Sequence, residues 1–242
     1  MTESAADFKA RLHSVRDRIA AAARRVDRNP DDVHLMPVSK TVPPDRMRLA
    51  AAAGITEFGE NKVQEAYRKW QELSDLNLRW CVIGNLQTNK ARYVARFASE
   101  FHALDRIRAA EALERRLQLE GLSLDVFVQV NTSGEESKYG VAPKKLPKLL
   151  KDLAAFETLN VRGLMTLAVF SADADRVRPC FQLLRQLRDQ AQQDAIHPNL
   201  RELSMGMSAD FELAIEEGAT TVRIGQEIFG PRPLPDSHYW PD

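Results

Sequence analysis

Short runs of apolar and β-branched residues alternate with longer stretches of helical periodicity along most of the chain. The short runs have the length of buried strands, and the stretches between them repeat apolar residues every three or four positions. Eight strands are predicted, at 33–40, 56–59, 80–84, 101–105, 125–132, 161–168, 202–204 and 220–225. The intervening helices are predicted at 45–53, 62–73, 89–98, 107–119, 143–156, 175–193 and 209–217. Repeated strand–helix units indicate parallel strands joined by right-handed crossovers.

An amphipathic helix precedes the first strand. Ser4 and Asp7 have the spacing of a capping pair, and the helix should end near Asn29 and Pro30. Its apolar face is expected to hold Phe8, Leu12, Val15, Ile19 and Val26. We therefore expect residues 1–30 to form an N-terminal helix that packs on the unit that follows.

Eight such units in 242 residues predict an α/β fold, a single-domain (β/α)8 TIM barrel, whose typical length is about 250 residues. The alternative is a doubly wound open sheet. Against it, the turn at 40–44 after the first strand lacks the glycine-rich fingerprint of a dinucleotide site. The barrel should span 31–230, with a proline-rich tail at 231–242.

The composition excludes several classes of protein. The chain has 34 Lys and Arg against 34 Asp and Glu, so it lacks the basic surplus typical of nucleic-acid or membrane-surface binding. No apolar run is long enough to span a membrane, and charged residues occupy the N-terminal positions where a signal peptide needs an apolar stretch. A cytoplasmic protein is expected.

The cysteines and histidines show no pattern of metal ligands. Cys81 and Cys180 are far apart and belong to no CxxC motif, which favours two buried thiols over a disulfide or a zinc site. His13 and His34 are expected to be structural, and His102 lies within the fourth strand. No metal is predicted.

Lys40 ends the first predicted strand, which is otherwise mostly apolar. In a barrel of this kind, reactive residues lie at the carboxyl ends of the strands. Lys40 is either a strand-end lysine that reaches solvent or an amine that forms a Schiff base. The second interpretation needs help from the surroundings, because a lysine pKa of about 10.4 leaves few neutral amines at pH 7.

The segment 204–208 leads from the seventh strand into a helix for which Ser208 is the expected N-cap. Backbone amides around Gly206 and a helix N-terminus suit a phosphate dianion, although a capped helix start alone is the commoner case. Arg223 and Gly225 end the eighth strand, where the arginine supplies a cation and the glycine permits close approach. Together these features indicate a phosphate site.

Other polar positions allow two interpretations. Asn61 lies at a strand-to-helix turn and is equally well explained as an N-cap or as a hydrogen-bond partner of a ligand ring. Asn85 and the polar loop at 131–140 are ambiguous in the same way.

Several segments occur in the order found in one known family. The chain resembles the pyridoxal phosphate homeostasis proteins, also called YggS-like or PROSC-like, which are similar to the N-terminal barrel of alanine racemase. The resemblance runs from about residue 33 to 230. It rests on the motifs VSK at 38–40, FGEN at 58–61, IGNLQTNK at 83–90, GLM at 163–165, LSMGMS at 203–208 and VRIG at 222–225.

The resemblance implies pyridoxal 5'-phosphate as the cofactor, held as a Schiff base on Lys40. It implies that Arg223 faces the pyridine nitrogen and that Asn61 contributes to the cofactor site. The phosphate-binding motifs correspond to Ser204, Gly206, Met207, Ser208, Ile224 and Gly225. The residue types agree with the chemistry of this cofactor, because its aldehyde needs an amine, its phosphate needs backbone donors and its ring nitrogen needs a polar partner.

The same resemblance implies a non-catalytic, monomeric carrier that maintains vitamin B6 balance and hands the cofactor to recipient apo-enzymes. The alternatives are an amino-acid racemase or another pyridoxal phosphate enzyme, a barrel aldolase acting on a sugar phosphate, and a scaffold. Racemisation needs a base on each face of the α-carbon. The few residues after the last strand, among them Tyr239, are expected to be too few to supply the second base.

Overall fold

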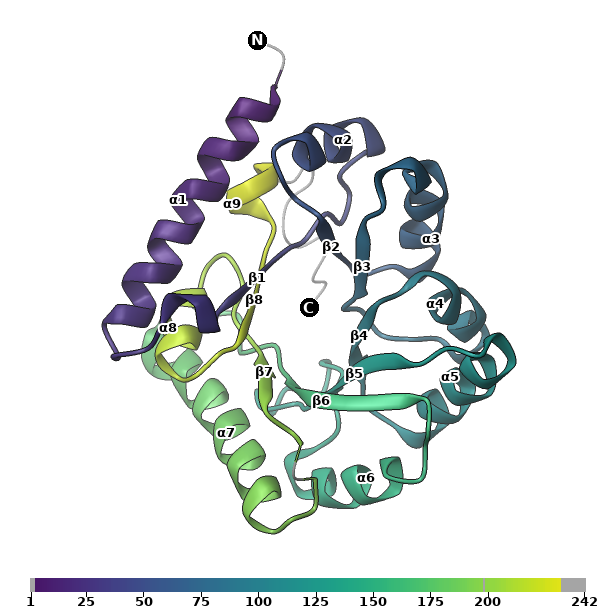
Figure 1. Ribbon diagram of the computed structural model, residues 1–242. Helices are drawn as coiled ribbons and strands as arrows, with labels where there is room; N and C mark the ends of the chain where they lie inside the picture. The colour runs from purple at the N-terminus through teal and green to yellow at the C-terminus, as the bar shows by residue number, and fades with distance from the viewer. Residues whose placement is uncertain (1–2, 198, 232–242) are drawn as a thin grey trace.

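The computed structural model describes residues 3–197 and 199–231, in which eight parallel strands are surrounded by helices (Figure 1). The strands are β1 (His34–Pro37), β2 (Glu57–Glu60), β3 (Arg79–Val82), β4 (Glu100–Leu104), β5 (Leu124–Gln129), β6 (Leu159–Met165), β7 (Glu202–Ser204) and β8 (Thr221–Ile224). The helices are α1 (Ala5–Arg24), α2 (Pro44–Ala52), α3 (Val63–Glu72), α4 (Ala91–Phe97), α5 (Ile107–Glu120), α6 (Leu146–Leu153), α7 (Ala174–Gln193), α8 (Phe211–Glu216) and α9 (Gln226–Phe229). Short 3-10 turns lie at Pro30–Asp32, Ser74–Leu76, Thr88–Lys90 and Pro143–Lys145.

The sheet runs in the order β1-β8-β7-β6-β5-β4-β3-β2, and every pair in it is parallel. The two end strands, β1 and β2, meet at a single parallel bridge between Val38 and Gly59. There the amide of Ser39 donates to the carbonyl of Gly59 at 3.0 Å. The result is a nearly closed barrel, so the predicted (β/α)8 fold is confirmed and the open sheet is excluded.

Helix α1 covers the outside of the barrel beside α8, α9 and α2 (Figure 1). The capping box between Ser4 and Asp7 is present, as the sequence predicts. The helix ends at Arg24, earlier than expected. Val26 therefore lies beyond the helix and is 36% exposed, whereas the other four predicted face residues are buried.

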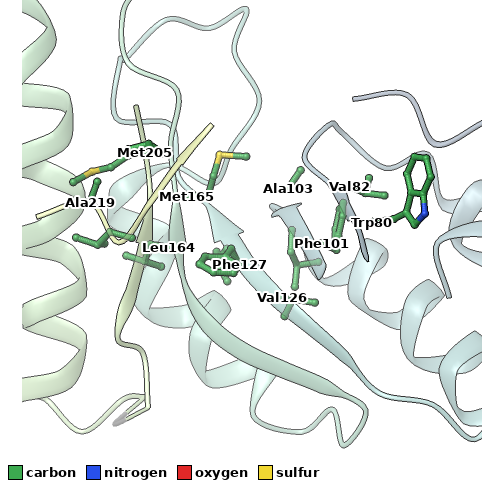
Figure 2. Packing of buried hydrophobic residues seen from close by; sticks show 14 of the residues in the cluster. Trp80, Val82, Phe101, Ala103, Val126, Phe127, Leu164, Met165, Met205 and Ala219 are labelled. Carbon is green, nitrogen blue, oxygen red and sulfur yellow. The ribbon is translucent and has the colours of Figure 1, made fainter. Parts of the chain in front are cut away.

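The apolar core is one continuous cluster that involves nearly every strand. Figure 2 shows part of it, from Trp80 on β3 through Phe101 on β4 and Phe127 on β5 to Leu164 on β6. Both cysteines are buried thiols, as predicted. Gly163 lets β6 and β7 pack closely, because a Cβ there would lie 2.1 Å from the carbonyl oxygen of Glu202.

Two helices begin later in the chain than predicted. Helix α6 begins at Leu146, because residues from Pro143 form a separate 3-10 turn. Helix α8 begins at Phe211 with Asp210 as its N-cap residue, so the prediction of Ser208 as the N-cap is wrong. Of the predicted tail, residues 232–242 lie outside the described part of the chain. None of the described helices is long and apolar enough to cross a membrane.

The packing of α1 predicts a large difference between two leucines. Leu12 lies on the buried face of α1 and is 4% exposed, whereas Leu119 near the end of α5 is 72% exposed. Leu12→Ala should lower the free energy of unfolding by about 2–5 kcal/mol, and Leu119→Ala should change it by less than about 0.5 kcal/mol. Urea denaturation measures both values. Equal effects would contradict docking of α1 on the barrel.

Candidate functional site

A cavity of about 580 Å³ opens at the carboxyl ends of the strands. This volume is within the range of about 300–1,000 Å³ typical of small-molecule sites. The structure brings together most of the predicted site residues in its lining: Lys40, Asn61, Met207, Ser208, Arg223 and Gly225. The cavity therefore lies at the end of the barrel where active sites of this fold are found.

The charged side chains in the described lining of the cavity are all basic. Lys40, Arg46, Lys62 and Arg223 line the cavity, and none of its described lining residues is Asp or Glu. Arg46 is ion-paired with Glu3 at 2.6 Å, but the lining as a whole still has an excess of basic residues, although the whole chain has equal numbers of acidic and basic residues. Such a lining favours an anionic ligand.

Lys40 lies three residues after the end of β1 and is partly buried. The backbone before it is fixed on both sides, because the Val38 amide donates to the Ile224 carbonyl at 2.9 Å and the Ser39 amide donates to Gly59. Thr41, after it, has a φ of 66°, in the left-handed region that β-branched residues rarely adopt. Lys40 thus leaves the barrel at a sharp, well-defined turn.

Arg223 lies within the barrel on β8 and is 3% exposed. Its guanidinium donates to the Ser204 hydroxyl and to the Thr166 carbonyl, each at 2.8 Å. Burial lowers the pKa of Arg223 to about 10, and the charge of Asp210 acts in the opposite direction. Arg223 therefore stays a cation at neutral pH, held in one orientation.

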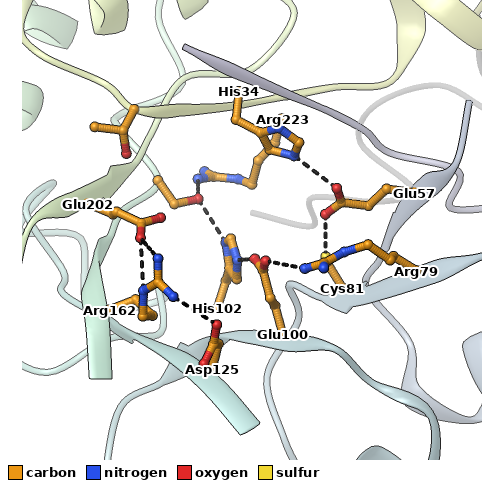
Figure 3. A network of polar contacts seen from close by, with 12 residues as sticks. His34, Glu57, Arg79, Cys81, Glu100, His102, Asp125, Arg162, Glu202 and Arg223 are labelled. Atoms are coloured by element: carbon orange, nitrogen blue, oxygen red, sulfur yellow. Dashed lines mark hydrogen bonds and ion pairs between the residues drawn. The ribbon is translucent and has the colours of Figure 1, made fainter. Parts of the chain in front are cut away.

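A chain of hydrogen bonds continues from Arg223 toward the floor of the barrel (Figure 3). Ser204 accepts from Arg223, and its Oγ lies 3.0 Å from Nδ1 of His102. Nε2 of His102 lies 2.8 Å from Glu100. Because a carboxylate only accepts, neutral His102 carries its proton on Nε2, and the Ser204 hydroxyl donates to Nδ1.

Ser204, Gly206 and Ile224, which were expected at the phosphate, lie behind the cavity lining. Ser204 is fully buried and supports Arg223. Gly206 has a φ of 93°, and a Cβ there would lie 2.6 Å from the Cβ of Ala214. Its carbonyl accepts from the Arg223 amide at 3.0 Å, so this turn also positions Arg223.

The amides at 206–208 are partly used within the protein. The Met207 amide donates to the Asp210 carboxylate at 2.6 Å, and burial raises the pKa of Asp210. Ser208 lines the cavity two residues before the cap. Among the hydroxyls predicted for a phosphate, that of Ser208 is the one placed at the cavity.

The ambiguous asparagines have different surroundings. Asn61 lines the cavity and packs tightly on Gly84, where a Cβ would lie 2.0 Å from the Asn61 carbonyl oxygen. Asn85 lines it too and donates to Asp105 at 3.2 Å. Asn131 organises its own loop, since its amide nitrogen donates to the carbonyls of residues 135 and 138.

Three aromatic residues of the described lining were not among the predicted site residues: Tyr139, Phe170 and Phe229. Tyr139 and Phe170 line the cavity from the loops after β5 and β6, and they are 63% and 76% exposed. Large aromatic side chains in otherwise polar loops were the available signal. Gln129, at the end of β5, was also missed because it lies within a predicted strand.

The opposite end of the barrel holds a second polar network (Figure 3). Glu57 contacts His34 at 3.0 Å and the Cys81 thiol at 2.7 Å, and Arg79 donates to Glu100 at 3.0 Å. Ligand atoms of Glu57, Cys81 and Glu100 lie within 4.8 Å of one another. The carboxylates already have cationic or imidazole partners, so these side chains satisfy one another.

Comparison with known proteins gives consistent matches over nearly the whole chain. The family model for the alanine racemase N-terminal domain matches residues 11–233. A pyridoxal phosphate homeostasis protein of Aquifex aeolicus is 43% identical over 92% of this chain and 97% of its own length. The protein of the same name from Escherichia coli K12 is 41% identical, over 93% and 97%.

Solved structures show the same relationship. PipY of Synechococcus elongatus, solved with PLP bound, is 36% identical with a TM-score of 0.81, covering 92% of this chain and all of its own. An alanine racemase of Clostridium difficile is 13% identical with a TM-score of 0.71, and the match covers 95% of this chain but 57% of the racemase. The racemase likeness shows a shared fold.

Two histidines in the barrel should titrate on opposite sides of the ordinary value. The hydrogen bond that His34 donates to Glu57 raises the pKa of His34, whereas burial lowers the pKa of His102. His34 therefore favours folding below pH about 6.5 and loses this effect as pH rises through its folded pKa. His102 lowers stability as pH falls below about 6.5, because the unfolded chain then binds the proton more strongly.

Histidine Cε1–H signals followed by NMR between pH 5 and 8 measure both groups. The variants His34→Gln and His102→Gln assign the signals. If the His102 signal titrated at a higher pH than that of His34, the described hydrogen-bond network would be wrong.

Proposed function

Because the chain belongs to the pyridoxal phosphate homeostasis protein family, we propose that it binds pyridoxal 5'-phosphate in the cavity at the carboxyl ends of its strands. Lys40 is the amine that bears the cofactor in this proposal. The observation that carries it is the cavity lining, which places Lys40 among further cations and, within the described residues, without any carboxylate. A phosphate dianion with an aldehyde is complementary to these groups.

The residues present fit the parts of the cofactor. When bound, pyridoxal 5'-phosphate supplies an aldehyde that reacts with a primary amine, and a phosphate that anchors it. Lys40 would take the aldehyde, and Ser208 with the backbone at Gly225 would hold the phosphate. Gly225 admits close approach of backbone, since even a Cβ there would lie 3.0 Å from the Val38 carbonyl oxygen.

Arg223 would face the pyridine nitrogen. As a fixed cation with hydrogen bonds to Ser204 and Thr166, it would donate to the ring nitrogen and disfavour a proton there. A ring without that proton is a weaker electron sink. This arrangement suits a protein that holds the cofactor better than one that stabilises a carbanion on it.

The proposed role is therefore a carrier, which acts as a cytoplasmic monomer and hands the cofactor to recipient apo-enzymes. The relatives that match this chain end to end have the name of a homeostasis protein, not of an enzyme. The alanine racemase, by contrast, has more than a third of its length outside the match. We propose that the catalytic groups peculiar to racemases are absent from the carrier.

Replacing Lys40 tests the assignment of the amine. Lys40→Ala should abolish the visible absorption band of the lysine-bound cofactor and leave the fold intact, because the side chain lies at the cavity and outside the core. Lys62→Ala, which changes another lysine of the lining, should retain the band. Borohydride reduction followed by peptide mapping should label Lys40. A label mainly on Lys62, Lys90 or Lys138 would overturn the assignment.

The phosphate should supply much of the affinity, because charge-assisted hydrogen bonds are about twice as strong as neutral ones. Pyridoxal, which lacks the phosphate, should bind far more weakly than pyridoxal 5'-phosphate. Ser208→Ala should weaken binding of the phosphate form roughly 10-fold, in keeping with about 1.5 kcal/mol for one such bond, and leave that of pyridoxal unchanged. Fluorescence titration measures the dissociation constants. Equal affinity for the two compounds would refute a phosphate site at this turn.

A further inference from the structure

Lys69, on α3, is a buried lysine that faces the seam between β1 and β2. It is 6% exposed, although lysine is almost never buried without a partner. Its ammonium lies 3.0 Å from the Ser39 carbonyl oxygen and 2.8 Å from an oxygen of each of Glu60 and Glu65. An ammonium has three donors, so these three oxygens satisfy it completely.

The same carboxylates hold the chain on both sides of Lys40. Glu60 accepts from the Ser39 hydroxyl at 2.7 Å, and Glu65 accepts from the Thr41 amide at 3.1 Å. Ser39 and Thr41 are the residues immediately before and after Lys40. Lys69 therefore connects both flanks of Lys40 through one buried charge.

The backbone at this point needs such support. The left-handed conformation of Thr41 is sparsely populated for a β-branched residue and persists only where its surroundings determine it. The hydrogen bond to Glu65 fixes the Thr41 amide, and Lys69 fixes Glu65. Glu60 is 1% exposed, and its second oxygen has no hydrogen-bond partner. Without the charge of Lys69, Glu60 would be an uncompensated buried carboxylate.

We propose that Lys69 is a positioning residue that sets the direction in which Lys40 enters the cavity. It acts through Glu60 on Ser39 and through Glu65 on Thr41, and it touches no ligand. This inference rests on the proposed function, in which Lys40 bears the cofactor. It goes further by assigning the geometry of Lys40 to a residue outside the cavity lining.

Lys69→Met tests the proposal because it keeps much of the buried side-chain stem and removes the charge. Glu114→Gln is the control: Glu114 is a buried carboxylate on α5 that accepts from Thr158, away from the cavity lining. The Glu114→Gln variant shows how a loss of stability away from the cavity affects affinity for pyridoxal 5'-phosphate. Affinity for pyridoxal 5'-phosphate should fall at least 10-fold in Lys69→Met, and the visible band should shift or weaken at saturation. Glu114→Gln should bind like the unaltered chain.

Hydrogen exchange gives a second readout that needs no cofactor. In Lys69→Met, the Thr41 amide should exchange at least 10-fold faster than in the unaltered chain. The exchange rates of the amides in β5 and β6, which lie farthest from β1 and β2 in the strand order, should not change. If the unaltered chain bound no cofactor, the proposed function would be refuted. Hydrogen exchange at Thr41 would still test whether Lys69 holds the backbone around Lys40. If it bound cofactor and Lys69→Met matched it in affinity, band and exchange, the role of Lys69 would be refuted.

Glu65→Gln keeps the test decisive if Lys69→Met does not fold. Glu65 is only partly buried, with a side chain 32% exposed, so its replacement should be tolerated. This variant weakens the link between Lys69 and Thr41 and leaves Glu60 paired. Faster exchange at Thr41 together with a several-fold loss of affinity supports the proposal, and no change in either overturns it.

Discussion

The barrel closes at a seam where β1 and β2 share one backbone bridge, and the geometry of the cavity depends on how that seam is held. Side-chain contacts between the two strands add to that bridge. At one end of the seam His34 contacts Glu57, and at the other Ser39 contacts Glu60. Glu60 also forms a buried ion pair with Lys69, and removing one partner of such a pair is strongly destabilising. Side-chain contacts at the seam therefore help to fix the register of β1 and β2, which share only one backbone bridge.

The interior of the barrel is polar where many barrels are filled by aliphatic layers. Arg223, Ser204 and His102 occupy its middle, and each is buried with hydrogen-bond partners. A buried polar group without such partners would cost about 1–3 kcal/mol, so each hydrogen bond of this network favours the folded barrel. Its completion also holds the Arg223 guanidinium still. The same bonds thus serve stability and the electrostatics of the cavity.

The fold could be predicted from the sequence because each parallel strand is a short apolar run between helical stretches. The cavity could be predicted in part, since strand-end residues such as Lys40 and Arg223 follow directly from that fold. Ser204 was predicted to contact the phosphate because it lies at the end of the seventh strand. The sequence does not show how deep in the barrel its side chain lies, and in the structure Ser204 is fully buried behind the cavity lining. Ser208 and Asp210 are both good N-cap residue types two positions apart, and the helix begins only at Phe211, which makes Asp210 the N-cap residue although its side chain forms no capping hydrogen bond.

Lys69 shows the limit of such reasoning more sharply. By type and position it is a lysine on a helix, for which a solvent-facing side chain is the reasonable expectation. Its partner Ser39 lies 30 residues earlier, and the contact between them exists only once the seam has closed. No local periodicity encodes a contact of this kind.

The pairing of β1 with β8 also has a consequence for synthesis on the ribosome. Lys40 follows the first strand and Arg223 belongs to the last, so the two walls of the cavity emerge from the exit tunnel at nearly opposite ends of translation. A nascent chain displays the β1 segment long before the strand that covers its edge exists, and an uncovered edge invites pairing with other chains. Neither half of the cavity is present alone in a form that a ligand could stabilise. The complete cavity can therefore form only after β8 has been translated.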